Sequence, residues 1–125
     1  QNGFTKYTPS SGMPELRQAI SEKFKKDNNL EYKPSQVIVS NGAKQSCFNA
    51  IAAVCDPGDE VLIPAPYWLS YPEMVRLAGA EPVIIPTKQG NDWKITAEDF
   101  ENAMTPRTKM IIINSPGNPT GSVYT

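Results

Sequence analysis

The sequence predicts an α/β fold with a mostly parallel sheet between two layers of helices. Short apolar segments rich in β-branched residues alternate with segments of helical periodicity along the chain. The apolar segments are near-continuous runs, which is typical of parallel strands covered on both faces. With 125 residues, 39% of them hydrophobic, the chain matches one ordinary globular domain.

The first half of the chain predicts two helices and one strand. Residues 14–28 predict an amphipathic helix, because Pro14 suits a first helical position and a lysine-rich face lies opposite an apolar one. The apolar residues at helical spacing are Leu16, Ala19, Ile20 and Phe24. The β-branched run 36–40 predicts a strand. Residues 41–54 predict a helix that is apolar on more than one side, as a helix buried against a sheet would be.

The second half repeats the alternation. Its predicted elements are a strand after the Pro-Gly turn within 56–66, a helix over 70–80, a strand over 81–86, a helix over 96–104 and a strand over 109–114. Pro72 near the start and Gly79 at the end delimit the helix over 70–80. Thr96 and Asp99 resemble a capping box, with Asp in place of the usual Glu or Gln.

Charge and histidine content exclude several classes of function. Twelve basic and thirteen acidic residues give a net charge of −1, which does not indicate a nucleic-acid-binding surface. The chain has no histidine. This excludes Ser-His-Asp and Cys-His catalysis and most catalytic zinc sites by this chain alone, and we predict no metal site.

The cysteines and the apolar runs indicate where in the cell the protein is located. Cys47 and Cys55 lack CxxC spacing, so we interpret them as reduced core residues of a cytoplasmic protein. The apolar runs are too short to span a bilayer, and no signal-peptide pattern is present. Because the chain begins with Gln1 and ends at Thr125 after a turn-rich loop, we expect it to be cut from a longer protein.

Three loops that follow predicted strands carry candidate binding residues, because ligands of such sheets bind beyond the carboxyl ends of the strands. Gly42, Ala43 and Lys44 open a helix, where backbone N–H groups could hold a phosphate, although such a turn often has no ligand. Without a GxxxxGK[ST] or GxGxxG motif, ATP and NAD are disfavoured.

The other two loops offer an aromatic ring and an amide. Trp68 could present its flat face to a ligand ring or could close the top of the core. Asn118, before Pro119, could donate to a ligand oxygen or could simply form a turn. Trp93 is interpreted as capping the edge of the core, and Arg107 as a turn residue before the last strand.

Four segments in order carry a resemblance to a known family. They are KYTPSSGMPELRQAI, VSNGAKQSCFNAI, DPGDEVLIPAPYWLSYPEMVRLAGAEPV and TPRTKMIIINSPGNPTG. The chain resembles the fold type I aminotransferases that use pyridoxal 5'-phosphate, most closely the bacterial aspartate aminotransferase subgroup. The resemblance implies that residues 1–125 are the N-terminal part of the cofactor-binding large domain, a partial three-layer sandwich that is incomplete at both ends.

The resemblance also implies roles for individual residues. The backbones of Gly42, Ala43 and Lys44 would contact the cofactor phosphate. Trp68 would stack on the pyridine ring, Asn118 would donate to its phenolic oxygen, and both would face the substrate.

Tyr7 matches the family tyrosine that reaches the phosphate in the neighbouring subunit, which implies a homodimer. The peptide bond between Asn118 and Pro119 is predicted to be cis, as is common in the family.

The implied reaction moves an amino group from an amino acid, with aspartate or glutamate expected, to a 2-oxo acid. No catalytic residue is assigned in this chain, because the family's Schiff-base lysine lies downstream of the Asn-Pro motif. Lys44 matches the phosphate-loop lysine instead. The 125-residue chain alone is therefore expected to have no turnover.

Three alternatives remain open from sequence. The first is another pyridoxal phosphate enzyme, such as an aromatic or prephenate aminotransferase or a carbon-sulfur lyase. The second is an aminotransferase-like ligand-sensing module of a transcription regulator, which a basic winged helix upstream of Gln1 would indicate. The third is a structural fragment whose sheet a partner chain completes.

Overall fold

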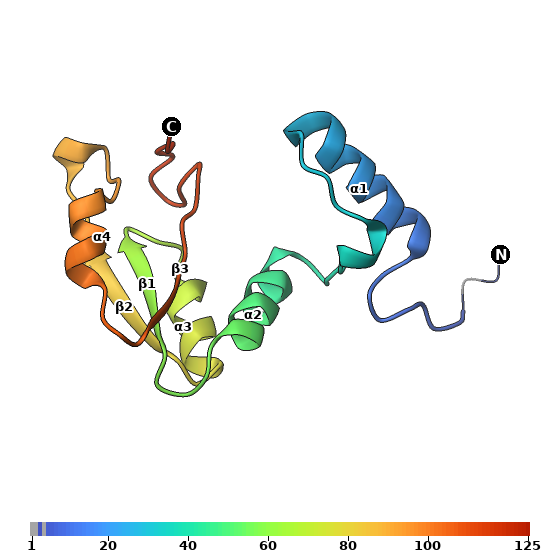
Figure 1. The fold of residues 1–125 in the computed structure, drawn as a ribbon, viewed down its shortest axis with the longest axis horizontal. Helices are drawn as coiled ribbons and strands as arrows, with labels where there is room; N and C mark the ends of the chain where they lie inside the picture. Colours follow the sequence, from blue (N-terminus) through green and yellow to red (C-terminus); the bar gives the residue numbers. More distant parts are fainter. Residues whose placement is uncertain (1–2, 4) are drawn as a thin grey trace. The chain divides into compact units, whose positions relative to one another are not determined.

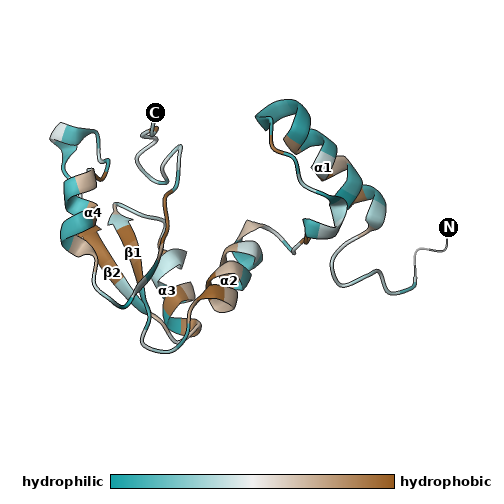
Figure 2. Ribbon diagram, viewed as in Figure 1, coloured by the Kyte–Doolittle hydropathy of each residue, from teal (hydrophilic) through white to brown (hydrophobic). Residues whose placement is uncertain are grey.

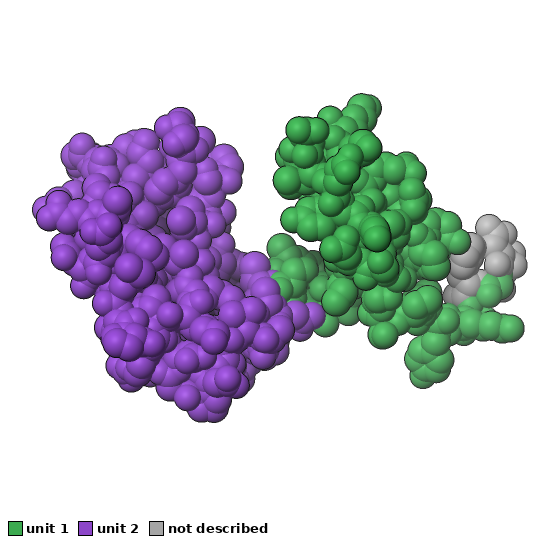
Figure 3. All heavy atoms as spheres, viewed as in Figure 1, with its two compact units in different colours: residues 1–46 green, residues 47–125 purple. Residues whose placement is uncertain are grey.

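The computed structural model describes residue 3 and residues 5–125. The chain forms two compact units, residues 1–46 and residues 47–125 (Figure 3). The helix α2 (Ala43–Val54) begins in the first unit and continues into the second.

The N-terminal unit is built around α1 (Pro14–Asn28), whose bounds confirm the prediction. Pro14 lies in its first turn, and Asn29 ends it in a left-handed conformation with φ 54°. None of the α1 residues is buried. The apolar face of α1 is partly covered by the following segment, where the ring of Tyr32 meets Phe24 edge-on at 6.0 Å between centroids.

The strand predicted over residues 36–40 is wrong. The short 3-10 helix η1 (Pro34–Gln36) occupies its start, and the remainder is irregular. Val39 instead donates its N–H to the Ser11 carbonyl oxygen at 3.0 Å. β-branched residues favour a strand only where a neighbouring strand completes the ladder, and among the residues described no strand pairs with this segment.

Gly12 permits the close approach of the Ser11 and Val39 segments. A Cβ on Gly12 would lie 2.7 Å from the Cβ of Val39, and the glycine has φ +101°. Both the space and the backbone conformation therefore require glycine here.

The C-terminal unit holds a parallel sheet, which confirms the predicted α/β class. Its elements are β1 (Glu60–Ala65), α3 (Ser70–Leu77), β2 (Glu81–Pro86), η2 (Gln89–Asn91), α4 (Ala97–Ala103) and β3 (Thr108–Ile111). The strand order is β2-β1-β3, and β1 pairs in parallel with both neighbours (Figure 1). The predicted capping box of Thr96 and Asp99 is confirmed at the start of α4.

The topology places helices on both faces of this sheet. The chain runs from β1 outward to β2 and then back across β1 to β3, so right-handed crossovers put α3 and α4 on opposite faces. In Figure 1, α3 and α4 lie on different sides of the strands.

The core of the C-terminal unit lies around the central strand β1. Val61 and Ile63 pack in one cluster with residues from α2 and α3, while Leu62, also fully buried, points to the other face because side chains alternate along a strand. In Figure 2 the hydrophobic colouring covers the strands of this unit and parts of α2 and α3.

The helix α2 buries less than its sequence predicts. Only Ile51 of its residues is buried, with Cys47 and Phe48 partly so. The helix expected to be buried against a sheet does pack on the core, but through one face only, and all four of its alanines are exposed. Cys47 and Cys55 are both free thiols, and burial raises the pKa of Cys55.

An ion pair with a buried carboxylate and an exposed guanidinium joins β1 to the turn before β3 at the amino end of the sheet. The Glu60 side chain is only 5% exposed and accepts from the Arg107 guanidinium and the Thr105 hydroxyl. Glu60 also donates its backbone N–H to the Arg107 carbonyl oxygen at 2.8 Å. Arg107 is thus more than the turn residue that the sequence predicts.

No helix in the described part of the chain is long and apolar enough to cross a membrane.

Candidate functional site

The candidate site lies at the carboxyl end of the sheet in the C-terminal unit. Because β1 and β3 are parallel neighbours, the loops that follow them leave the same edge of the sheet. The first loop carries Trp68, and the second, over residues 112–124, carries Asn118.

The loop after β1 presents half-buried aromatic residues. The Ala65–Pro66 peptide bond is cis, and the Thr87 hydroxyl, just beyond β2, donates to the Ala65 carbonyl oxygen. The Trp68 ring packs on the core and meets the Tyr71 ring edge-on, with 5.4 Å between centroids and 87° between planes. Burial raises the pKa of the Tyr71 phenol.

The loop after β3 is closed by its own hydrogen bonds. Ile112 extends the sheet by donating to the Leu62 carbonyl oxygen at 3.0 Å, after which the chain leaves the ladder. The Asn118 N–H donates to Asn114 Oδ1 at 2.9 Å, and the Gly117 N–H donates to the Ser122 carbonyl oxygen at 2.8 Å. Asn118 itself is exposed at the tip of this loop.

Two peptide bonds in this loop are cis. The Asn118–Pro119 bond is cis, as predicted. The Ser115–Pro116 bond is also cis, which the sequence analysis did not predict.

A small cavity of about 30 Å³ links the two loops. Asn118 and Tyr71 both line it, and the Tyr71 ring meets the Trp68 ring edge-on. Other aromatic residues complete the wall: Tyr67, Trp93 and Tyr124.

Sequence reasoning did not assign these aromatic residues to a site. Trp93 was predicted to cap the edge of the core, but 38% of it is exposed, it has φ 54°, and it lines the cavity. One feature of the sequence could have indicated a role for Tyr124: it is an aromatic residue that lies shortly after a loop of Asn, Pro and Gly. A half-buried position so close to a polar loop indicates a packing or binding role.

The candidate phosphate loop lies in the N-terminal unit. Gly42 has φ +85°, a left-handed conformation that favours glycine, and an added Cβ would meet no atom within 4 Å. Its carbonyl oxygen accepts from Ser46 N–H at 3.4 Å, while its N–H donates to the Ser40 carbonyl oxygen at 2.8 Å. A ligand held by Gly42 N–H would have to share that donor.

Ala43 and Lys44 are the first two residues of the twelve-residue helix α2. Backbone N–H groups of a first helical turn point along the axis away from the helix and carry the positive end of its dipole. They are donors suited to an anion such as a phosphate.

Tyr7 also belongs to the N-terminal unit and is fully exposed, at 106% of its reference area. A fully exposed tyrosine is available for contact with a ligand or another chain.

The arrangement offers binding groups of three kinds. It has helix N-terminal donors in the first unit, and flat aromatic faces and a loop amide at the sheet edge of the second. Among residues 3 and 5–125, no three His, Cys, Asp or Glu side chains are grouped as a metal site requires.

Comparison with known proteins gives matches over the whole chain. The family described as "Aminotransferase class I and II" matches residues 1–125. The aspartate aminotransferase of Bacillus sp. (strain YM-2) is 58% identical over 125 residues, which are 100% of this chain and 32% of that protein. The Petunia hybrida bifunctional aspartate aminotransferase and glutamate/aspartate-prephenate aminotransferase is 56% identical over 124 residues, 99% of this chain and 26% of that protein.

The fold agrees with that of a solved relative. The crystal structure of the aspartate aminotransferase from Rhizobium meliloti superposes with a TM-score of 0.94 at 48% identity, covering 98% of this chain and 31% of that one. The chain thus spans about a third of the length of the relatives that it matches.

Proposed function

The chain belongs to the class I and II aminotransferases, and we propose that it forms part of an enzyme that moves an amino group from an amino acid to a 2-oxo acid through pyridoxal 5'-phosphate. The observation that carries this proposal is the match over all 125 residues to a protein named aspartate aminotransferase. Residues 1–125 would be the N-terminal part of the cofactor-binding large domain.

The residues described fit the chemical groups of this cofactor. Its phosphate suits the N-terminus of α2, where Ala43 and Lys44 offer backbone donors beside Gly42. Its ring suits the aromatic residues after β1, and its phenolic oxygen suits the amide of Asn118, which lines the cavity with Tyr71. These are the residues that we propose bind the cofactor.

When bound, pyridoxal phosphate supplies the carbonyl carbon that accepts the amino group and a ring that takes up the electrons of the broken Cα bond. Asn118 would donate to the phenolic oxygen and thereby favour its ionised form. Trp68 would stack on the ring and would face the substrate with Asn118. The first turn of α2 would hold the phosphate, and the aromatic wall around Tyr71 would limit the access of water.

We propose aspartate or glutamate as the amino donor, supported by the names of the relatives. A second candidate acceptor is prephenate, favoured by the printed activity of the Petunia hybrida relative. The residues that select the substrate side chain would lie largely outside residues 1–125.

We propose that the complete protein is a homodimer, to which Tyr7 would contribute by reaching the phosphate of the neighbouring subunit. Its full exposure supports this role. We place the protein in the cytoplasm, where thiols such as Cys47 and Cys55 stay reduced. We assign no catalytic lysine to this chain, so residues 1–125 alone would have no turnover.

The test uses the complete protein that contains this chain. After incubation with pyridoxal phosphate and removal of the excess, bound cofactor is measured by absorbance, and amino transfer is measured with aspartate and 2-oxoglutarate and, separately, with prephenate as acceptor. We expect about one cofactor per chain and transfer from aspartate. A protein that retains no cofactor and transfers no amino group from aspartate to either acceptor would refute the proposal.

A further inference from the structure

Asn118 is held by a loop that leaves the sheet completely. Beyond Ile112 the chain has left the ladder with β1, and the bonds described above join Asn118 to Asn114 and Gly117 to Ser122. These bonds fix the shape of the loop, but both partners of each bond lie within it. The placement of the loop against the rest of the site must therefore come from other contacts.

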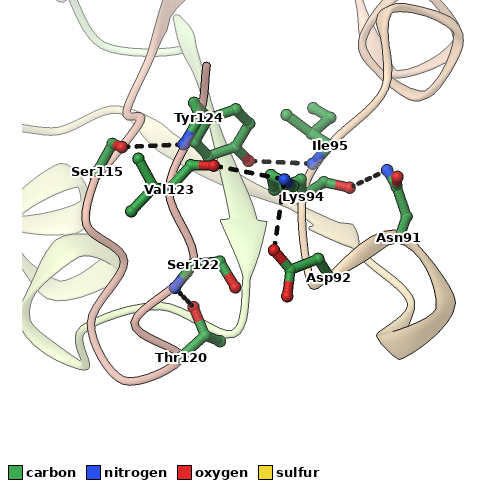
Figure 4. A network of polar contacts seen from close by, with 9 residues as sticks. All are labelled: Asn91, Asp92, Lys94, Ile95, Ser115, Thr120, Ser122, Val123 and Tyr124. Carbon is green, nitrogen blue, oxygen red and sulfur yellow. Dashed lines mark hydrogen bonds and ion pairs between the residues drawn. The ribbon is translucent and has the colours of Figure 1, made fainter.

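Tyr124 supplies two of those contacts (Figure 4). Its backbone N–H donates to Ser115 Oγ at 3.0 Å, which closes the base of the loop. Its hydroxyl oxygen accepts from the backbone N–H of Ile95 at 3.0 Å, which joins the loop to the connection between β2 and α4. One residue thus connects the two sides of the loop base and ties that base to a separate segment.

The neighbouring ion pair is the weaker part of this network. Lys94 Nζ lies 3.4 Å from the Val123 carbonyl oxygen and 3.3 Å from Asp92 Oδ2, both long distances, with the Asp92 side chain 68% exposed. Solvent screens such contacts. The bond between Ile95 N–H and the Tyr124 hydroxyl has ordinary length and is partly buried, so its loss would leave a backbone donor without this partner.

Tyr124 also lines the cavity that Asn118 lines. A shift of this residue therefore changes the same small space into which the Asn118 loop is packed. The segment between β2 and α4, to which Tyr124 is bonded through Ile95, has an unusual backbone conformation, since Asp92 and Trp93 both have φ 54°. Such conformations persist where the surrounding structure holds them.

We propose that Tyr124 is a positioning residue for Asn118: through Ile95 and Ser115 it sets where the loop holds the Asn118 amide. The inference rests on the proposed function, which gives Asn118 its ligand, the phenolic oxygen of pyridoxal phosphate. Tyr124 need not touch the cofactor. It acts by fixing the base of the loop whose tip does.

The experiment compares Asn118→Ala, Tyr124→Phe and the double variant in the complete protein loaded with pyridoxal phosphate. The readout is the pH midpoint of the absorbance change of the bound cofactor. Asn118→Ala should raise this midpoint by about one pH unit, because a lost donor disfavours the ionised oxygen. Tyr124→Phe should raise it by roughly half as much, and the double variant should match Asn118→Ala alone, since coupled residues are not additive.

Two controls separate positioning from stability. Tyr32→Phe, in the N-terminal unit, should leave the midpoint unchanged. Ser115→Ala should shift the midpoint in the same direction as Tyr124→Phe, while Ser115→Thr, which keeps the hydroxyl, should not. The Ser115 pair also tests the proposal if Tyr124→Phe does not fold.

The results distinguish a failure of the role inferred for Tyr124 from a failure of the role proposed for Asn118. If Asn118→Ala shifts the midpoint but Tyr124→Phe and Ser115→Ala change only the melting temperature, Tyr124 is merely structural and the inference is overturned. If Asn118→Ala leaves the midpoint unchanged, Asn118 is not a ligand of the cofactor. In that case its role in the proposed function fails, and the inference fails with it.

Discussion

The two units of the chain bury their apolar residues very differently. In the C-terminal unit, Val61, Leu62 and Ile63 on β1 are all 0% exposed. Among the described hydrophobic residues of the N-terminal unit, Val37 alone is buried. Its neighbour Ile38 is 71% exposed, and α1 buries none of its residues. The comparison shows that an amphipathic pattern specifies a helix without specifying what covers its apolar face.

Matched leucine truncations should give the largest contrast. Leu62→Ala should lower the free energy of unfolding by about 3 kcal/mol, because it opens a cavity in a fully buried site. Leu16→Ala, at a residue 46% exposed, should cost about 1 kcal/mol or less. Urea denaturation of the complete protein measures both. Equal costs would show that the apolar face of α1 is buried in the complete protein, and the comparison would fail.

The second largest difference is expected in the free energy lost when the cation of an ion pair is removed from each unit. Arg107→Ala leaves Glu60 buried without its cation and should cost about 2 kcal/mol, a value reduced from the fully buried case because Arg107 is 65% exposed. Lys23→Ala breaks the exposed pair with Asp27 in α1 and should cost about 0.3 kcal/mol. Denaturation at low and high salt measures both changes. A cost of a few tenths for Arg107→Ala would mean that water reaches Glu60.

Helix caps offer a smaller test. Thr96→Ala removes the side-chain cap of α4 and should destabilise by about 1 kcal/mol. The N-cap residue of α1, Met13, makes no side-chain capping bond, so Met13→Ser should stabilise by about 0.5 kcal/mol. Melting temperatures of the two variants should move in opposite directions. A fall with Met13→Ser would show that the Met13 side chain has contacts that outweigh a cap.

The smallest effects concern two exposed carboxylates. A hydrogen bond from the Thr96 side chain lowers the pKa of Asp99, and a hydrogen bond from Lys25 lowers that of Glu31, aided by its charge. Because the pKa of each carboxyl is lower in the folded state, its ionised form stabilises the fold at pH values above the ordinary carboxyl pKa. This stabilisation is lost as the pH falls through the pKa of the folded state.

Salt should separate these two carboxylates. Added salt screens the charge of Lys25, so the pKa of Glu31 should return toward its ordinary value while that of Asp99 moves less. NMR titration of the carboxyl carbons at low and high salt measures this. Equal responses would show that charge, not the capping bond, dominates at Asp99.

Local signals in the sequence predicted several elements closely. Pro14 and the apolar spacing gave the bounds of α1, and the run 81–86 gave those of β2. Thr96 with Asp99 gave the start of α4. These signals succeeded because the interactions that they describe join residues close in the chain.

Interactions between distant residues were not predictable. Residues 36–40 have strand propensity but no strand neighbour in the part described, and propensity carries no information on neighbours. The bond from Ile95 to Tyr124 uses a backbone N–H, which every residue except proline has. The resemblance directed attention to Trp68 and Asn118, whereas the residues that brace them, Tyr71 and Tyr124, follow only from the fold.

The central place of β1 in the sheet has a consequence for synthesis on the ribosome. Both of its neighbours come later in the chain, and the partner of Glu60 on β3, Thr108, is added roughly 50 residues and 2 to 10 seconds afterwards at ~5–20 residues per second. During that interval Val61, Leu62 and Ile63 have at most one strand beside them. The nascent chain therefore exposes its most apolar strand early, and this is the stage at which a chaperone would protect it most effectively.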